Sequence, residues 1–326
     1  MARAVVTGGC GFVGAHLAEA LVARGDEVTV VDSVPPPEHL AVLREHAAFV
    51  QADVRDVGAL SRAVRPGVDV VYHMASVVGV DRYLSRPLDV IDINCGGTRN
   101  VLDLAARAGA ALLVASTSEV FGKNPGVPWP EDADRVLGPT TADRWTYSTS
   151  KALAEHMTFA FAGQHGLTAT VVRYFNVYGP RQRPAYVLSR SIHRALNGIP
   201  PVVYDGGGQT RCFTYVDDAV RGTLAAADAA EGGAFNLGSM DETTVAEAVR
   251  TVAELTGYRT PPAPVDTRAA LGPSYEDLMR RMPDTTKAAT VLGWKCHTSL
   301  RDGLAKTIEW ARRNPWWLEL RDSGAS

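Results

Sequence analysis

The chain has 326 residues, of which 46% are hydrophobic and 21% are charged, and its formal net charge is −3. This composition is typical of a globular protein with a plentiful core, and the length favours about two domains or one large one. The slightly acidic balance gives no reason to expect a nucleic acid or an anionic membrane surface as a partner. No apolar run approaches the ~18 residues that cross a membrane, and the first residues lead directly into a strand instead of a signal peptide.

Four cysteines are widely scattered along the chain, at Cys10, Cys95, Cys212 and Cys296. Their spacing contains no C-x-x-C pair and predicts reduced thiols, with neither a disulfide framework nor a metal site. Together with the missing signal peptide, this favours a cytoplasmic location.

The first predicted strand, residues 2–7, runs into a glycine-rich segment. Gly8, Gly11 and Gly14 form G-x-x-G-x-x-G immediately before a helical stretch at residues 15–23. Glycine permits the tight turn, and it lets the backbone approach a pyrophosphate at the positive end of the helix. We therefore predict a dinucleotide site that includes the intervening Phe12 and Val13.

The second predicted strand, residues 27–31, ends at Asp32, which lies 18 residues after Gly14. A carboxylate at this point of a dinucleotide fold binds the adenosine ribose hydroxyls, although an Asp at a strand end also serves as a simple turn former. No Arg or Lys occurs in residues 33–37, so the sequence favours NAD over NADP.

Strands and helical segments continue to alternate, with strands at residues 68–72 and 110–115 and a helix at residues 93–107. This alternation predicts an α/β protein with a Rossmann-like, doubly wound parallel sheet, whose ligands bind at the carboxyl ends of the strands. His73 is expected to end its strand beside the cofactor without titrating. The other polar or small residues at predicted strand ends are assigned to the cofactor (Asp53, Val54, Met74, Ala75, Ser76) or to the reaction (Thr117, Ser118, Glu119).

A Pro- and Gly-rich loop at residues 122–145, interpreted as a substrate cover, precedes a helix at residues 147–162. Tyr147 and Lys151 are four residues apart, so they share one face of this helix. An ammonium beside a phenol favours the phenolate, and a bound nicotinamide cation favours it further. Because a free tyrosine has a pKa of about 10, service as a base near neutrality needs a shift of roughly three units, or about 4 kcal/mol. That shift requires a cofactor pocket.

Beyond the strand at residues 169–173, shorter elements interrupted by Pro, Gly and Arg replace the regular alternation. We therefore divide the chain into an NAD-binding Rossmann domain at residues 1–178 and a smaller α/β substrate domain at residues 179–326. The segment 213–237 is expected to return to the first domain. A final helix at residues 299–312 precedes a tail expected to fray after Pro315, apart from Trp316 and Trp317.

With the glycine motif, Asp32, Thr117 and Tyr147-x-x-x-Lys151 in place, the chain resembles the extended short-chain dehydrogenase/reductases that act on nucleotide sugars. The resemblance covers nearly the whole length and includes residues 173–181, 208–218 and 292–294. It implies a tightly retained NAD, a UDP- or dTDP-sugar substrate, and a homodimer paired through helices 94–107 and 147–162. It also implies substrate-binding roles for Asn176, Arg181, Arg211 and Arg281.

The triplet Thr117-Ser118-Glu119 narrows the resemblance. The 4,6-dehydratases of the family have Thr-Asp-Glu at these positions, and the Asp that serves as their acid is replaced by Ser118 in this chain. Simple 4-epimerases of the family usually lack the Glu. The run 112–122 is similar to UDP-glucuronate decarboxylases, although Phe121 replaces their usual tyrosine, a position interpreted as packing. Arg281 aligns with an arginine of those decarboxylases.

The chemistry implied by the resemblance begins with Tyr147 taking the proton of the sugar 4-hydroxyl while hydride passes to NAD. Thr117 holds the C4 oxygen, and the resulting β-keto acid loses carbon dioxide. Glu119 positions the ring and handles protons around C5, and Arg211 or Arg281 binds the diphosphate or the carboxylate. Hydride return gives UDP-xylose, and early release gives UDP-4-keto-pentose.

Other interpretations of these residues stay open. Glu119 and Ser118 also suit a helix start, and Arg281 also suits a solvent-facing position. A 4-epimerase acting on UDP-glucuronate or UDP-glucose uses the same Tyr147. A non-catalytic NAD- or nucleotide-binding regulator uses the same fold, because fold alone does not determine function.

Overall fold

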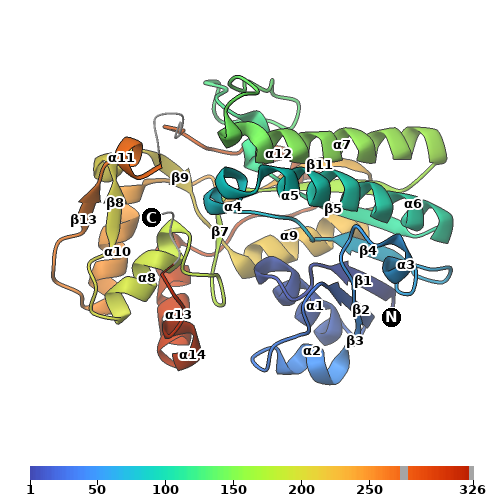
Figure 1. Ribbon diagram of the computed structural model, residues 1–326, viewed down its shortest axis with the longest axis horizontal. Coiled ribbons are helices and arrows are strands. Elements are labelled where there is room, and N and C mark those ends of the chain that lie inside the picture. The colour runs from blue at the N-terminus through green and yellow to red at the C-terminus, as the bar shows by residue number, and fades with distance from the viewer. Residues whose placement is uncertain (272–277, 323–326) are drawn as a thin grey trace.

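A computed structural model describes residues 1–271 and 278–322 and contains a seven-stranded sheet whose strands all run parallel (Figure 1). The strand order is β11-β6-β5-β4-β1-β2-β3. This confirms the predicted Rossmann-like doubly wound fold. The strands are β1 (Arg3–Thr7), β2 (Glu27–Asp32), β3 (Ala48–Gln51), β4 (Val70–His73), β5 (Ala111–Thr117), β6 (Ala169–Tyr174) and β11 (Gly233–Leu237).

Alternate residues of each strand enter two separate hydrophobic clusters, one on each face of the sheet. Val6 belongs to the cluster covered by α1 (Phe12–Arg24) and α9 (Val216–Ala229), whereas Val5 belongs to the cluster covered by α6 (Thr98–Ala108) and α7 (Thr146–His165). The short helices α2 (Ala41–His46) and α3 (Val57–Leu60) extend the first and the second layer respectively. Burial of both faces explains why the strand sequences are apolar almost throughout instead of alternating with polar residues.

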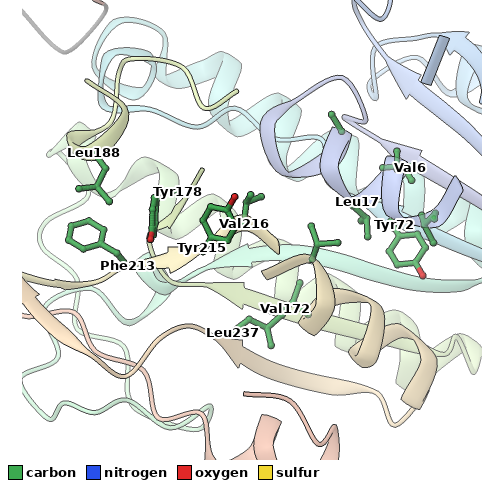
Figure 2. Packing of buried hydrophobic residues seen from close by; sticks show 14 of the residues in the cluster. Val6, Leu17, Tyr72, Val172, Tyr178, Leu188, Phe213, Tyr215, Val216 and Leu237 are labelled. Carbon is green, nitrogen blue, oxygen red and sulfur yellow. The ribbon is translucent and has the colours of Figure 1, made fainter. Parts of the chain in front are cut away.

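The first cluster continues from the sheet into the C-terminal part of the chain. Figure 2 shows it running from Val6 and Leu17 to Tyr178, Leu188 and Phe213. The sheet and the C-terminal part of the chain therefore share one apolar core.

The order in which successive strands are added to the sheet reverses between β1 and β4, which are neighbours in the sheet. The loops that leave the carboxyl ends of these two strands diverge to opposite faces. A crevice at such a switch point is where open α/β sheets bind their ligands. The glycine-rich segment follows β1 and residues 74–79 follow β4, so both predicted cofactor loops lie at this point.

The helix predicted at residues 93–107 is interrupted. A π-helical turn, Asp92–Gly97, separates α5 (Pro87–Ile91) from α6, preceded by α4 (Val80–Ser85). A Cβ on Gly97 would lie 2.4 Å from Cγ2 of Val54, so this glycine lets the helix pack tightly against the strand end. The widened turn places Asn94 inside the protein.

Most of the C-terminal elements gather at one end of the sheet, on the left in Figure 1, whereas α12 (Thr286–Val291) lies beside β11. Trp316 and Trp317 are held as expected, but the expected fraying of the rest of the tail after Pro315 is wrong for Leu318 and Asp322, because the carbonyl of Leu318 lies 3.0 Å from His193 Nε2 and Asp322 is held by an ion pair. Trp317 is buried and its Nε1 donates to the carbonyl of Gln182 at 2.9 Å, while Asp322 pairs with Arg190 at 2.6 Å. The elements are β7 (Val177–Tyr178), α8 (Val187–Leu196), β8 (Val202–Tyr204), β9 (Thr210–Cys212), β10 (Thr214–Tyr215), β12 (Glu242–Thr244), α10 (Val245–Thr256), β13 (Ala263–Val265), α11 (Thr267–Leu271), α12 (Thr286–Val291), α13 (Leu300–Arg312) and α14 (Pro315–Leu318).

Helix α7 buries a polar stripe in addition to apolar residues such as Phe161. Tyr147, Ser150, Lys151, Glu155 and Thr158 recur at helical spacing and are all buried. Buried polar groups need partners, so this stripe indicates a built site at the start of the helix. Within the described residues, the search for a helix long and apolar enough to cross a bilayer finds none.

Candidate active site

A cavity of about 820 Å³ opens at the carboxyl ends of the central strands, and its size suits a dinucleotide or a comparably large ligand. Its wall combines segments that are far apart in the sequence. These are the glycine-rich loop (Gly8, Cys10, Gly11, Phe12, Val13, Gly14), the residues after β4 (Met74, Ser76), the end of β5 with the turn that follows it (Ser116, Thr117, Ser118, Glu119), Tyr147 and Lys151 on α7, and a later set that includes Asn176, Arg181 and Arg281.

The glycine-rich loop requires its glycines. Gly8 has a φ of +67°, and a Cβ there would lie 2.6 Å from the backbone nitrogen of Ala75. A Cβ on Gly14 would lie 2.2 Å from the carbonyl oxygen of Gly8. The loop closes on itself through Gly11, whose N–H donates to that carbonyl at 3.0 Å, and it delivers the chain into α1. A bare backbone at a helix N-terminus is suited to a diphosphate, so these residues fit NAD.

Gly14→Ala is expected to weaken NAD binding by at least about tenfold and to lower thermal stability, because a Cβ cannot stand 2.2 Å from an oxygen without moving the loop. Isothermal titration with NAD and a thermal melt measure the two effects. Gly25→Ala is the matched control, since Gly25 ends the same helix and a Cβ there meets nothing within 4 Å, although its φ of +88° predicts a modest loss of stability. Equal NAD affinity in both variants would contradict the role assigned to the loop.

Asp32 holds the glycine-rich loop from the neighbouring strand. Its carboxylate accepts the backbone N–H of Cys10 at 3.0 Å and that of Val34 at 3.3 Å. Asp53 forms an ion pair with Arg55 at 2.7 Å. Within residues 1–271 and 278–322, the cavity wall includes Met74 and Ser76 but not the other predicted cofactor residues Asp32, Asp53, Val54 and Ala75, which lie at or after the ends of β2, β3 and β4. Their contacts with NAD stay predictions.

Tyr147 and Lys151 both face the cavity, as their spacing predicts. Burial lowers the pKa of Lys151 to about 8, against the opposing effect of Glu155. Burial also raises the pKa of Tyr147, the charge of Glu119 raises it further, and hydrogen bonds with Thr117 and Ser76 offset part of the rise. The shift of the Tyr147 pKa therefore runs opposite to the one expected from an adjacent ammonium.

Asn94, on the π-helical turn, connects the Tyr147 hydroxyl to the backbone of α7. Its Oδ1 accepts from Ser76 Oγ at 2.9 Å, and its Nδ2 donates to Ser150 Oγ at 3.1 Å. Ser150 Oγ in turn donates to the carbonyl of Tyr147 at 2.9 Å. Asn94 was not among the predicted site residues, because residues 93–107 have the pattern of an ordinary helix. The Gly-Gly pair directly after Cys95 was the available signal, since glycine inside a helical pattern marks close packing.

Glu119 stands between two arginines. Arg144 Nη1 donates to its Oε2 at 2.7 Å, and Arg281 Nη1 approaches its Oε1 at 3.4 Å. Burial alone would raise the pKa of Glu119, but Arg144, Arg281 and then Arg211 outweigh burial and lower that pKa to about 2. The short helical turn Ser118–Phe121 is capped by Thr117, whose Oγ1 accepts the N–H of Glu119 at 3.2 Å, and not by the Glu119 carboxylate. Ser118 is buried and lines the cavity.

Three polar atoms of cavity-lining residues have no hydrogen-bond partner among the described residues, namely Asn176 Oδ1, Gln182 Oε1 and Arg281 Nε. Buried polar atoms of this kind cost stability unless a ligand or water completes them. Arg181 is less available, because both of its terminal nitrogens contact Glu19, at 2.7 and 2.6 Å. Arg211 does not line the cavity, and its Nη1 donates to two backbone carbonyls at 2.7 Å.

His73 is held in the interior and does not reach the cavity wall. Its Nδ1 lies 2.7 Å from Thr7 Oγ1 and its Nε2 lies 3.0 Å from Thr98 Oγ1. Burial lowers its pKa to about 3. The expectation that His73 does not titrate in the reaction is consistent with this placement.

A buried ion pair supports the catalytic elements from behind. Glu155 Oε2 accepts from Arg173 Nη2 at 2.7 Å, and Glu155 Oε1 accepts from Ser116 Oγ at 2.5 Å. Ser116 precedes Thr117 on β5, and Glu155 is four residues after Lys151 on α7. The pair therefore fixes the strand end and the helix relative to each other.

Residues 4–238 match the NAD dependent epimerase/dehydratase family. The chain belongs to this family. It is 38% identical, over 95% of its length and 98% of the relative's, to a UDP-N-acetyl-alpha-D-glucosaminuronate decarboxylase of Bacillus cytotoxicus. It is 36% identical to UDP-glucuronic acid decarboxylase 1 of Xenopus tropicalis, over 95% of this chain and 72% of the relative. The predicted membership of the extended short-chain dehydrogenase/reductases and the predicted cofactor, NAD, are confirmed.

Solved structures agree with this placement. The UDP-glucuronic acid 4-epimerase of Bacillus cereus, determined with UDP-glucuronic acid and NAD, superimposes with a TM-score of 0.83 at 26% identity. The match covers 95% of this chain and 99% of that one. The chain is therefore an NAD-dependent enzyme of this family.

Proposed function

We propose that the protein is an NAD-dependent decarboxylase of UDP-glucuronate that produces UDP-xylose, UDP-4-keto-pentose or both. The observation that carries the proposal is Glu119 held as a carboxylate between Arg144 and Arg281, on the wall of the cavity that also contains Thr117 and Tyr147. Relatives at 34–38% identity named as UDP-uronate decarboxylases support it.

The charge of the cavity suits such a substrate. A UDP-uronate carries a diphosphate and a carboxylate, both of which guanidinium groups bind well. Five arginines line the wall, compared with two acidic residues, Asp89 and Glu119. The arginines are Arg82, Arg86, Arg181, Arg183 and Arg281.

The reaction starts at the sugar 4-hydroxyl. We propose that Gly8, Gly11, Phe12, Val13, Gly14, Asp32, Asp53, Val54, Met74, Ala75, Ser76, Tyr147 and Lys151 hold NAD. When bound, NAD supplies a hydride acceptor for C4 and a positive charge that favours the tyrosinate. Tyr147 takes the hydroxyl proton, and Thr117 donates to the C4 oxygen as its charge changes. Ser76 and Asn94 keep the phenol oriented.

Decarboxylation follows because the ketone at C4 makes the C5 carboxylate a β-keto acid. The bond between C5 and the carboxylate carbon breaks, carbon dioxide leaves, and the electron pair delocalises onto the C4 oxygen as an enolate. Arg281 binds the carboxylate before it leaves, and Ser118 and Glu119 position the ring around C5. A proton from the solvent then bonds to C5 in place of the lost carboxylate, hydride returns to C4, and Tyr147 gives its proton to the C4 oxygen, which yields the pentose.

Glu119→Gln is expected to lower the rate of carbon dioxide release from UDP-glucuronate by about 10²-fold, because the amide keeps the shape of the side chain but not its charge or basicity. Mass spectrometry of the sugar nucleotide and trapping of carbon dioxide measure the rate. Glu45→Gln, an exposed substitution on α2, is the matched control. Full activity of the Glu119 variant would remove Glu119 from the mechanism.

The same assay separates the alternative functions. The relative from Bacillus cytotoxicus is named for UDP-N-acetylglucosaminuronate, so both uronates are assayed side by side. A product of unchanged mass and inverted C4 would instead indicate a 4-epimerase, as the Bacillus cereus structure is named. NAD binding without turnover of any UDP-sugar would leave a regulator.

We further propose a homodimer formed through α6 and α7. On α7, Leu153 is 48% exposed and Phe159 is 37% exposed, which leaves apolar surface for a partner, whereas Phe161 is buried within the subunit. Sedimentation analysis tests the assembly.

We also propose that the chain divides into two domains at Gly179, with segment 213–237 returning to the sheet domain. Four free cysteines fit a reducing compartment such as the cytoplasm.

A further inference from the structure

Arg144 approaches Glu119 from the protein side. It lies in the turn directly before α7, its side chain is only 3% exposed, and its Nη1 lies 2.7 Å from Glu119 Oε2. Within the described residues, the cavity wall includes Glu119 and Arg281 but not Arg144. The shorter of the two contacts therefore comes from an arginine that a ligand in the cavity does not meet.

Arg281 approaches the same carboxylate from the cavity side, and more loosely. Its Nη1 is 3.4 Å from Glu119 Oε1, beyond the usual range for a charge-assisted hydrogen bond. Its buried Nε has no hydrogen-bond partner among the described residues. Arg281 therefore keeps donors for a second anion, whereas the orientation of Glu119 depends mainly on Arg144.

We propose that Arg144 is a positioning residue for decarboxylation, which holds Glu119 as an oriented carboxylate so that Arg281 stays available to the carboxylate of the substrate. The inference rests on the proposed function and adds to it a residue that does not touch the substrate. Its physical basis is that two guanidinium groups contact one carboxylate at different distances. Arg144 binds Glu119 at 2.7 Å, whereas Arg281 approaches it only to 3.4 Å.

The charges around Glu119 give the expected direction of change. The groups that face it are Arg144, Arg281, Arg211 and Tyr147. Burial raises the pKa of Glu119, and the positive charges of Arg144, Arg281 and Arg211 lower it. Removal of Arg144 takes away one of these charges, so the pKa of Glu119 rises. Protonation of Glu119 then begins at a higher pH, and Arg281 becomes its main partner. Activity should therefore fall on the acid side, and the substrate should bind less tightly.

Arg144→Gln tests the inference through the pH profiles of kcat and of KM for carbon dioxide release. The acid limb of kcat is expected to move upward by roughly one pH unit or more, and KM is expected to rise about tenfold. Arg144→Lys should restore part of the shift, because the charge returns without the planar fork. Arg135→Gln is the matched control, since Arg135 belongs to the same loop and donates to the carbonyl of Val120 at 2.9 Å.

Two further measurements keep the test independent of folding and of turnover. In the Glu119→Gln background, adding Arg144→Gln should change the rate by no more than about twofold, because Arg144 acts through the missing carboxylate. Infrared difference spectra of Arg144→Gln should show a protonated carboxyl band on mild acidification. That band should be absent from the wild type and from the double variant.

The outcomes separate the two proposals. An acid limb unchanged from the wild type in Arg144→Gln and Arg144→Lys, or a large additional loss in the Glu119→Gln background, would overturn the positioning role. Failure of the wild type to release carbon dioxide from either uronate would overturn the proposed function instead. In that case the infrared band would still decide whether Arg144 holds Glu119 ionised.

Discussion

Tyr147→Phe is expected to lower kcat by about 10³-fold or more while NAD binding stays intact. The substitution removes one oxygen, and the reaction loses the group that takes the proton from the sugar 4-hydroxyl. The fold should tolerate the change. Ser76 still donates to Asn94 at 2.9 Å, and Thr117 still accepts from the N–H of Glu119 at 3.2 Å. Ser76 and Thr117, the hydrogen-bond partners of the phenol among the described residues, each keep one further hydrogen bond in the variant.

Turnover measured by sugar-nucleotide chromatography, with NAD affinity measured by calorimetry, tests this prediction. Tyr258→Phe is the control for loss of a phenol hydroxyl, because Tyr258 packs against the apolar core far along the chain from the site. A Tyr147→Phe rate within about tenfold of the wild type would show that another group carries the proton. A parallel loss of NAD affinity would mean that the phenol mainly holds the cofactor.

Arg173→Met is expected to lower the free energy of unfolding by about 3–5 kcal/mol, because it leaves the Glu155 carboxylate buried without its ion-pair partner. The two side chains are 10% and 7% exposed, and they share contacts at 2.7 and 3.0 Å. Arg173 also donates to the carbonyl of Glu131 at 2.6 Å, so the variant leaves a second acceptor unsatisfied.

Denaturant unfolding followed by circular dichroism measures the effect. Arg301→Met is the matched control, since Arg301 and Glu254 form a pair at 3.1 Å in which both side chains are more than half exposed. It should cost less than about 1 kcal/mol. The double variant Arg173→Met, Glu155→Leu should recover part of the loss, because the Glu155 carboxylate is removed together with its ion-pair partner, although the buried Lys151 loses the opposing charge of Glu155. An equal loss of unfolding free energy in Arg173→Met and Arg301→Met would show that burial of the Arg173–Glu155 pair does not cause the effect.

Much of the fold was predictable because short-range patterns encode it. The strand β6 was expected at residues 169–173 and is found at Ala169–Tyr174, since an apolar β-branched run suits a strand buried on both faces. The glycine spacing located the turn before α1, where Gly8 and Gly14 leave no room for a Cβ. The helical spacing of Tyr147 and Lys151 placed both side chains at one cavity.

Other features depended on contacts that local patterns do not encode. The π-helical turn that buries Asn94 arises from the close approach of Gly97 to Val54, residues from two separate elements. The chain beyond Trp317 is held because the carbonyl of Leu318 contacts His193 at 3.0 Å and Asp322 pairs with Arg190 at 2.6 Å, and local composition does not reveal contacts with such distant residues. The pKa of Tyr147 also moved against expectation, because burial and Glu119 act on it from outside its own helix.

The sequence by itself determined the family, the parallel sheet, the cofactor loop and the tyrosine–lysine pair, because these follow from short motifs and from the order of strands and helices along the chain. Only the tertiary structure decided how Glu119 is used. Arg144 is 25 residues away from it and Arg281 is 162 residues away, yet both reach its carboxylate. Electrostatic energy depends on distance in space and on burial, and neither quantity is defined until the chain has folded.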